Sequence, residues 1–184
     1  MPKYKPFIYL LMFIFTLGGI VSAQQTDSVK NSSLLDRLMG TWVAKSTSRN
    51  KDGSWKTDTT TSTWIWYKIL NDKAIQDDWY GKTSPDKLGD AKIIGTNIRI
   101  YNENEKKWYM GWIDTFNQKL LSFTATEENG KLIMEGNNTQ GRPVRNAFFN
   151  VTENSFDWVQ QWTFDDGKTW IDVAKIWCKR WRVN

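Results

Sequence analysis

Three polar side chains share predicted strand faces with large aromatic rings, and they are the first candidates for chemistry. Gln160 lies between Trp158 and Trp162 with a spacing of two residues, and Asp114 follows apolar residues at the same spacing. Arg145 precedes a pair of phenylalanines. Residues two apart on a strand point to the same face. If these faces point inward, the three polar groups need partners, which each other, water or a ligand's polar end can supply.

The same residues leave two further explanations open. Asp114 and Arg145 could perform acid–base chemistry in a cofactor-independent isomerase or hydrolase, or they could form a structural pair that fixes neighbouring strands. The chain contains no histidine, which excludes a Ser-His-Asp or Cys-His arrangement and a His-ligated haem. Cys178 is the only cysteine, and we interpret it as a buried apolar residue. We predict no catalytic residue, no metal site and no cofactor.

The aromatic content supports a ligand-binding hypothesis. The chain has 12 tryptophans, more than a barrel of this size needs to seal one end. Aromatic walls suit apolar or ring-bearing ligands through dispersion and stacking. Plain core packing is the competing explanation, and a module that binds carbohydrate or the cell envelope through exposed tryptophans is a third. The predicted ligand-binding residues are Trp64, Trp66, Trp79, Trp112, Asp114, Arg145, Phe148, Phe156, Trp158, Gln160 and Trp162.

The first 23 residues have the pattern of a secretory signal peptide. Lys3 and Lys5 precede the apolar run Phe7 to Ile20, and Val21-Ser22-Ala23 provides a small-residue cleavage site. We expect export to the periplasm or the medium, cleavage near Ala23 and no membrane insertion afterwards; an uncleaved anchor is the alternative. Removing the two lysines lowers the net charge from +5 to +3, because residues 1–23 contain no acid. A charge this small and dispersed does not indicate nucleic-acid binding.

The rest of the chain predicts one all-β domain. Residues 24–33 form a polar leader, and residues 34–184 form the domain, which starts with a short helix after Ser33 and ends it at Gly40. About ten short strands follow, separated by turn signals such as Asn129-Gly130. Short strands joined by tight turns predict a single antiparallel up-and-down β-barrel, whose closure removes exposed strand edges. The short helix is expected to plug one end.

The segment Thr163 to Trp170 matches the Asp-box pattern Ser/Thr-x-Asp-x-Gly-x-Thr-Trp. It occurs once, without the repeats of a propeller. We interpret it as a structural hairpin in which Asp165 accepts turn N–H groups and Gly167 supplies a positive φ angle.

The chain resembles the lipocalin-like (calycin) β-barrels. The features that carry the resemblance are the short helix before Gly40-Thr41-Trp42, the ten-strand meander and Arg180 near its end. The resemblance implies that Trp42 packs under Arg180 and closes the bottom of the barrel. More narrowly, Trp112-Ile113-Asp114 and Phe156-Asp157-Trp158 resemble an exported bacterial family of unknown function.

From these observations we expect an exported protein that holds a small apolar or aromatic ligand in an aromatic-lined cavity. Gln160, Asp114 and Arg145 would orient the polar end of that ligand.

Overall fold

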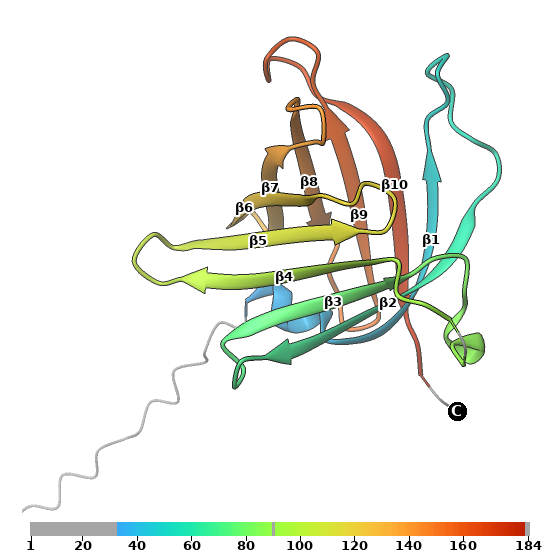
Figure 1. Ribbon diagram of the computed structural model, residues 1–184, viewed down its shortest axis with the longest axis vertical. Helices are drawn as coiled ribbons and strands as arrows, with labels where there is room; N and C mark the ends of the chain where they lie inside the picture. The colour runs from blue at the N-terminus through green and yellow to red at the C-terminus, as the bar shows by residue number, and fades with distance from the viewer. Residues whose placement is uncertain (1–32, 90, 183–184) are drawn as a thin grey trace, which may run out of the picture. The chain divides into compact units, whose positions relative to one another are not determined.

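The domain is a closed antiparallel barrel of ten strands, as predicted. The computed structural model describes residues 33–89 and 91–182, so the predicted signal peptide and the polar leader, apart from Ser33, lie outside the described residues. Each strand pairs with the next along the chain, and β1 pairs with β10 to close the barrel (Figure 1). This order is that of an up-and-down meander.

The strand bounds lie close to those that the turn signals indicate. The clearest difference is at β2, because the sequence predicts a strand from Trp55 to Ile69. The strand begins at Thr60, and Trp55 forms only an isolated bridge with Arg49. The strands are β1 Gly40–Ser48, β2 Thr60–Ile69, β3 Ala74–Tyr80, β4 Gly95–Asn102, β5 Lys107–Asp114, β6 Leu120–Glu128, β7 Lys131–Asn137, β8 Pro143–Phe149, β9 Ser155–Trp162 and β10 Ile171–Arg180.

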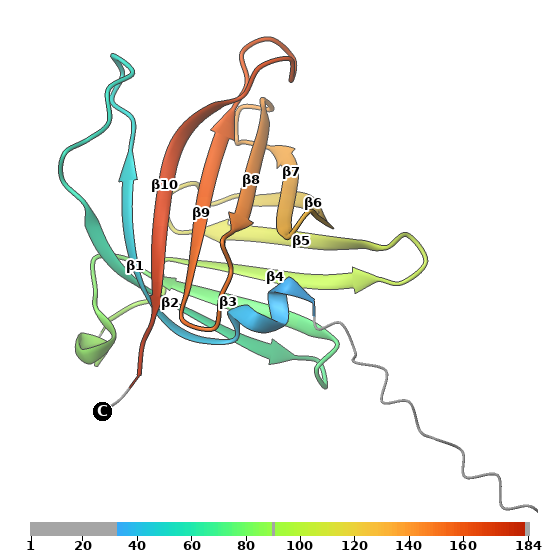
Figure 2. The same cartoon turned by 180° about the vertical axis from the view of Figure 1, so that it is seen from behind.

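Two 3₁₀ helices accompany the strands, η1 at Leu34–Leu38 and η2 at Pro85–Lys87. Figures 1 and 2 show β3 to β5 running steeply across the direction of β8 to β10, as expected of a small barrel with strongly tilted strands. No helix in residues 33–89 or 91–182 is long and apolar enough to cross a membrane.

The helix η1 packs its leucines into one end of the barrel interior. Leu35 and Leu38 are fully buried and belong to the hydrophobic core. At the start of η1, Glu127 of β6 accepts hydrogen bonds from the Ser33 hydroxyl and from the backbone N–H of Leu34. The carboxylate thereby satisfies N–H and O–H donors at the helix start, where negative charge is favourable.

Trp42 and Arg180 close the same end of the barrel. The two residues face each other across the β1–β10 pair, and the Arg180 guanidinium lies 4.1 Å from the centroid of the Trp42 ring. Arg180 also donates hydrogen bonds to the carbonyls of Arg37, at 2.8 Å, and Met39, at 2.6 Å, which are the residues at the end of η1. This is the arrangement that the resemblance to lipocalin-like barrels implies for these two residues.

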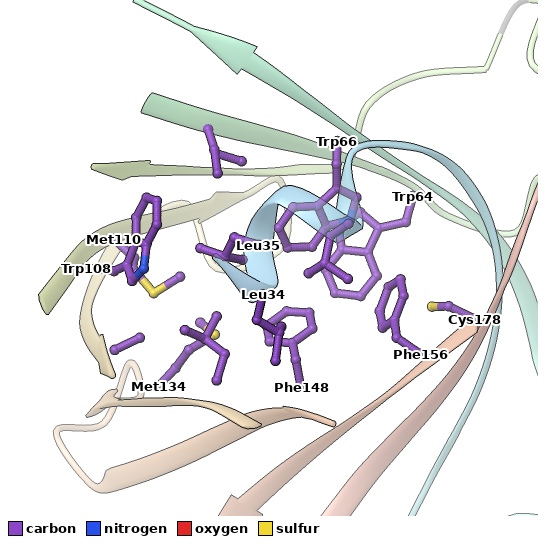
Figure 3. Close-up of a cluster of buried hydrophobic side chains, with 14 of the residues drawn as sticks. Leu34, Leu35, Trp64, Trp66, Trp108, Met110, Met134, Phe148, Phe156 and Cys178 are labelled. Carbon is purple, nitrogen blue, oxygen red and sulfur yellow. The ribbon is translucent and has the colours of Figure 1, made fainter. Parts of the chain in front are cut away.

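Above this closure lies a layer of aromatic rings that fills the barrel from wall to wall. Trp64 and Trp66 of β2 contact Phe148 of β8, with ring centroids 5.7 and 5.5 Å apart, and Phe156 of β9 packs edge-on against Trp42 at 4.7 Å. Figure 3 shows the rings of Trp64, Trp66, Phe148 and Phe156 near Leu34 and Leu35 of η1. These rings contact one another and are buried, so this half of the interior is packed core.

The Asp-box segment forms the β9–β10 hairpin. Asp165 Oδ1 accepts from the backbone N–H of Thr169 at 2.8 Å, and Oδ2 accepts from its hydroxyl at 2.7 Å. Gly167 has a φ of +88°. The hydrogen bonds of Asp165 and the positive φ angle of Gly167 are those expected of a structural hairpin.

We expect Arg180→Lys to lower the free energy of unfolding by about 1–2 kcal/mol, because a lysine ammonium cannot bond two helix-end carbonyls while stacking on an indole. Urea denaturation measures the change. Arg182→Lys is the matched control, since Arg182 bonds exposed groups at the same end, and it should cost little. Equal losses in both variants would show that Arg180 has no special role in closure.

Candidate ligand-binding cavity

The other half of the barrel interior contains a cavity of about 410 Å³. This volume is within the range of small-molecule sites in proteins, which is roughly 300–1,000 Å³. The cavity begins where the packed aromatic layer ends, because Trp64 and Phe148 belong to both. Five tryptophans line it, namely Trp64, Trp79, Trp112, Trp158 and Trp162.

The strand alternation places these side chains on the inner surface. Trp158, Gln160 and Trp162 of β9 have one parity and all line the cavity, while Phe156, of the same parity, lies deeper in the packed layer. Trp162 is partly exposed and lies at the open end, where Asn138, from the β7–β8 connection, also borders the cavity. The alternation of β9 therefore supplies three side chains of the cavity wall.

Two of the lining rings rest on glycines of neighbouring strands. A methyl group built on Gly95 of β4 would overlap the Trp112 ring of β5, and one built on Gly136 of β7 would overlap the Phe123 ring of β6. A glycine under an aromatic ring lets the ring lie flat against the backbone. These contacts keep both rings against the wall and leave the centre of the barrel open.

A buried ion pair stands between the packed layer and the cavity. Arg99 of β4 donates from Nη1 to Asp77 Oδ2 of β3, and the two side chains are 1% and 0% exposed. Trp64 Nε1 donates to the other oxygen of Asp77, and the Arg99 guanidinium lies 4.3 Å from the centroid of the Trp66 ring. Arg99 also lines the cavity. It is the only charged residue among the described residues that line the cavity, and its charge is neutralised by Asp77.

Burial affects the protonation of both partners. Loss of hydration raises the pKa of the Asp77 carboxyl, and the Arg99 guanidinium and the Trp64 N–H oppose that rise. Burial likewise lowers the pKa of Arg99, with Asp77 opposing the change. Each charge therefore depends on the other, since either one alone in this place would be strongly unfavourable.

Several buried polar atoms next to the cavity have no hydrogen-bond partner among the described residues. They include Asn97 Oδ1 on β4, Asn146 Oδ1 on β8 and Nε of Arg99. All three residues line the cavity, and each is at most 4% exposed. Buried polar groups in folded proteins are almost always paired. Unpaired groups around a cavity are therefore a functional signal.

The structure brings most of the predicted ligand-binding residues to the cavity. Trp66 and Phe156 lie beneath it, in the packed layer that seals the barrel. The predicted residues that line the cavity are Trp64, Trp79, Trp112, Phe148, Trp158, Gln160 and Trp162.

Besides Trp66 and Phe156, two more predicted residues, Asp114 and Arg145, do not line the cavity, and the prediction is corrected for all four. Asp114 ends β5 and caps the following turn, accepting from the backbone N–H groups of Phe116 and Asn117 and from Trp112 Nε1. Burial raises the pKa of Asp114, but these hydrogen bonds outweigh it and lower the pKa below its ordinary value. A carboxylate engaged in this way is a turn-forming group.

Arg145 points away from the cavity. It lies on the outer face of β8, where it bonds Glu135 of β7 at 2.7 Å and its guanidinium covers the Trp170 ring at 4.3 Å. The position of its strand neighbour explains the difference, since Asn146 takes the inward parity. Asp114 and Arg145 therefore do not form a pair, and the acid–base hypothesis loses the residues on which it relied.

Sequence reasoning missed the residues that carry most of the cavity's polarity. Asn97, Arg99 and Asp77 were not predicted. For β4 the sequence leaves the inward face undecided, because both parities carry apolar residues, among them Ile98 and Ile100 on the parity opposite to Arg99. Both are 47% exposed on the outside of the barrel. An Asp on one predicted strand and an Arg on the next, each sharing parity with aromatic residues, was the available signal. The described residues contain no group of three or more Cys, His, Asp or Glu side chains that could hold a metal ion.

Comparison with known proteins identifies the fold. No known protein family matches the chain, and no curated protein matches it. Among solved structures, the chain is similar to the S-type phycobiliprotein lyase CPES from Guillardia theta, with a TM-score of 0.54, 13% identity, and coverage of 82% of this chain and 92% of that one. At this identity the likeness concerns the fold, which is the closed antiparallel barrel described above. A protein with unknown function from Nostoc punctiforme also matches, with a TM-score of 0.24, 7% identity and coverage of 80% and 98%.

We expect Arg99→Met to destabilise the domain by about 3–5 kcal/mol, because it leaves the Asp77 carboxylate buried without its cation. Removing both charges in Asp77→Leu with Arg99→Met should recover much of that loss. Arg145→Met is the control, since it breaks the exposed pair with Glu135 and exposed pairs contribute at most about 1 kcal/mol. Chemical denaturation of the four proteins measures these differences.

The cost of Arg99→Met should also depend on pH. Without Arg99, the folded-state pKa of Asp77 rises further above its unfolded value, so the folded state keeps a proton that the unfolded state releases. The variant therefore loses stability as the pH rises from the unfolded-state pKa of Asp77, about 3.9, to its raised folded-state pKa. The difference in free energy of unfolding between the variant and the native protein narrows as the pH falls toward about 3.9. A deficit that stays constant over this range would contradict a buried, unpaired carboxylate.

Proposed function

We propose that this protein is an exported small-molecule carrier that holds an apolar or aromatic ligand in its barrel cavity. The observation that carries the proposal is the cavity itself, a space of about 410 Å³ with five tryptophans in its wall and unpaired polar atoms beside it. A barrel without a ligand-binding role gains stability by filling such a space with side chains.

The distribution of tryptophans favours this function over the other two hypotheses. Among the residues described, only Trp162 and Trp177 are exposed by more than about a third, and Trp162 borders the cavity. A row of exposed rings, which a carbohydrate-binding surface would need, is not present on the described part of the chain. An enzyme remains a weaker alternative, because Asp77 and Arg99 are paired with each other and fully buried.

Export is the second part of the proposal, and it is supported by the first 23 residues alone. A basic start, the apolar run Phe7 to Ile20 and the small residues before Gln24 match the three regions of a signal peptide. One solved structure with a similar fold is named a phycobiliprotein lyase. At 13% identity that likeness concerns the fold, so the ligand has to be inferred from this chain's own residues.

We expect the neutral dye N-phenyl-1-naphthylamine to bind with a rise in dye fluorescence and quenching of tryptophan emission. Trp158→Leu should weaken binding about tenfold, because a ring in the wall contributes both buried area and stacking. Trp177→Leu is the matched control, since Trp177 is exposed on β10 and is not part of the wall. Failure of the dye to bind, or equal effects of the two variants, would contradict cavity binding.

We expect the full chain, produced in a Gram-negative host, to be recovered from the periplasm or medium with Gln24 as its first residue. N-terminal sequencing of the product identifies this cleavage point, and a chain in which Leu11 and Phe13 are replaced by Arg should stay uncleaved. Recovery of the unprocessed chain in the membrane fraction would instead support the N-terminal anchor.

A further inference from the structure

The polar part of the cavity wall indicates which kind of small molecule it accepts, an inference that rests on the proposed binding function. We infer that the ligand is an uncharged planar heterocycle that carries an N–H donor beside a carbonyl acceptor, as in a lactam or a cyclic imide. Three properties of the wall support this assignment: its charge, its hydrogen-bonding groups and its aromatic faces.

The charge of the wall argues against an ionic ligand. Arg99 is the only charged side chain that lines the cavity within the described residues, and Asp77 neutralises it. An anion bound beside Arg99 would lie close to the Asp77 carboxylate and leave the site with a net negative charge in a poorly hydrated place. A cation would have only the carboxylate that Arg99 already occupies. A neutral ligand avoids both costs.

The hydrogen-bonding groups need a partner that both donates and accepts. Asn97 and Arg99 are two residues apart on the same face of β4, and in the described structure Asn97 Oδ1 lacks a donor while Arg99 Nε lacks an acceptor. A lactam presents the complementary pair on adjacent atoms, because its N–H donates and its carbonyl accepts. A carboxylate accepts only and an alkyl chain does neither, so each would leave part of this set unpaired.

The carboxamides on the other side of the barrel have the same character. Asn146 of β8 pairs in register with Gln160 of β9, and both side chains line the cavity. A carboxamide carries an acceptor and two donors on one carbon, and a half-turn about its terminal bond presents either kind to a ligand. Asn97 and Asn146 are each 4% exposed. Because these side chains have little contact with bulk water, a hydrogen bond from a ligand displaces few hydrogen bonds to solvent.

The aromatic faces explain why the ligand is planar. Trp64 and Trp79 contact each other edge to face at 5.1 Å, and the six-membered ring of Trp112 lies over Gly95 of the neighbouring strand β4. These rings form walls from β2, β3 and β5 around the Asn97 side chain of β4. A flat heterocycle can stack on such a ring while its polar edge meets the carboxamide, which is how proteins read nucleobase edges.

Ligand-observed NMR with three bicyclic probes of similar size tests the inference. Isoquinolin-1(2H)-one carries the lactam, its N-methyl derivative lacks the donor, and naphthalene lacks both polar groups. We expect the lactam to bind the native protein at least about tenfold more tightly than the N-methyl compound, because that compound leaves a buried acceptor unpaired. This comparison needs no variant, so it holds even if substitutions at the site impair folding.

The variants Asn97→Leu and Asn146→Leu provide the second arm. Each should weaken lactam binding about tenfold and leave naphthalene binding unchanged or stronger, because leucine replaces the carboxamide with a similar volume and no polar atom. Circular dichroism and thermal unfolding establish that each variant is folded. Leu121→Ile, at an apolar position of the wall, is the matched control and should affect both probes alike.

The outcomes separate this inference from the proposed function. If naphthalene and the lactam both fail to bind, the binding function is wrong and the inference fails with it. If naphthalene binds but N-methylation and the Asn→Leu variants leave lactam affinity unchanged, the function stands and the inference is overturned. Tighter binding of 1-naphthoate than of the lactam to the native protein would also overturn it and would indicate an anionic ligand.

Discussion

The ion pair between Asp77 and Arg99 is the interaction on which the interior of this barrel depends. Its two charges are almost completely excluded from solvent, so each is stable only in the presence of the other. The pair also engages both tryptophans of β2, since Asp77 accepts from Trp64 and Arg99 stacks on Trp66. Three consecutive strands, β2, β3 and β4, are thus held in one register by side chains that point inward.

This pair also divides the interior into two halves with different functions. Below it, Trp66, Phe148 and Phe156 pack against η1 and the Trp42–Arg180 closure and form a buried core. Above it, the rings lie against the walls, and glycines at positions 95 and 136 provide the space for them to do so. Apolar rings alone would tend to collapse across the barrel, as they do in the lower half. Polar groups at mid-depth need partners and therefore resist being covered by a neighbouring ring.

The sequence predicted the fold well because the signals for it are local. Turn residues such as Asn129-Gly130 separate the strands. The sequence predicts strands at Lys107 to Asp114 and Lys131 to Asn137, and β5 and β7 have these bounds. Closure of the barrel follows from connecting many short strands in order. The wall of β9 was also predictable, because Trp158, Gln160 and Trp162 share one face of the strand and most of the large rings of this strand lie on that face.

The polar part of the site was harder to predict, because it depends on which face of β4 and β8 is inward. The outer face of β4 carries isoleucines, which are also typical of a core-facing side of a strand. Only the folded barrel shows that these isoleucines are exposed to solvent. On β8, Arg145 and Asn146 are adjacent, so a choice of parity places either one inside. Asp114 has the inward parity but ends its strand, and a side chain at a strand end can turn back to cap the loop. Parity predicts direction only where a strand continues on both sides of the residue.

The presence of Asp77 is more informative about the ligand than the presence of Arg99. An arginine alone in an aromatic cavity would attract an anion, and a ligand carboxylate would then supply the missing negative charge. Here the chain supplies that charge itself, and Trp64 satisfies the second carboxylate oxygen. Because its charge is neutralised, Arg99 acts in the cavity as a planar hydrogen-bond donor. The carboxamides of Asn97 and Asn146 add hydrogen-bond acceptors to the wall of the same cavity. A wall of this kind selects a ligand by the pattern of its donors and acceptors and not by its charge.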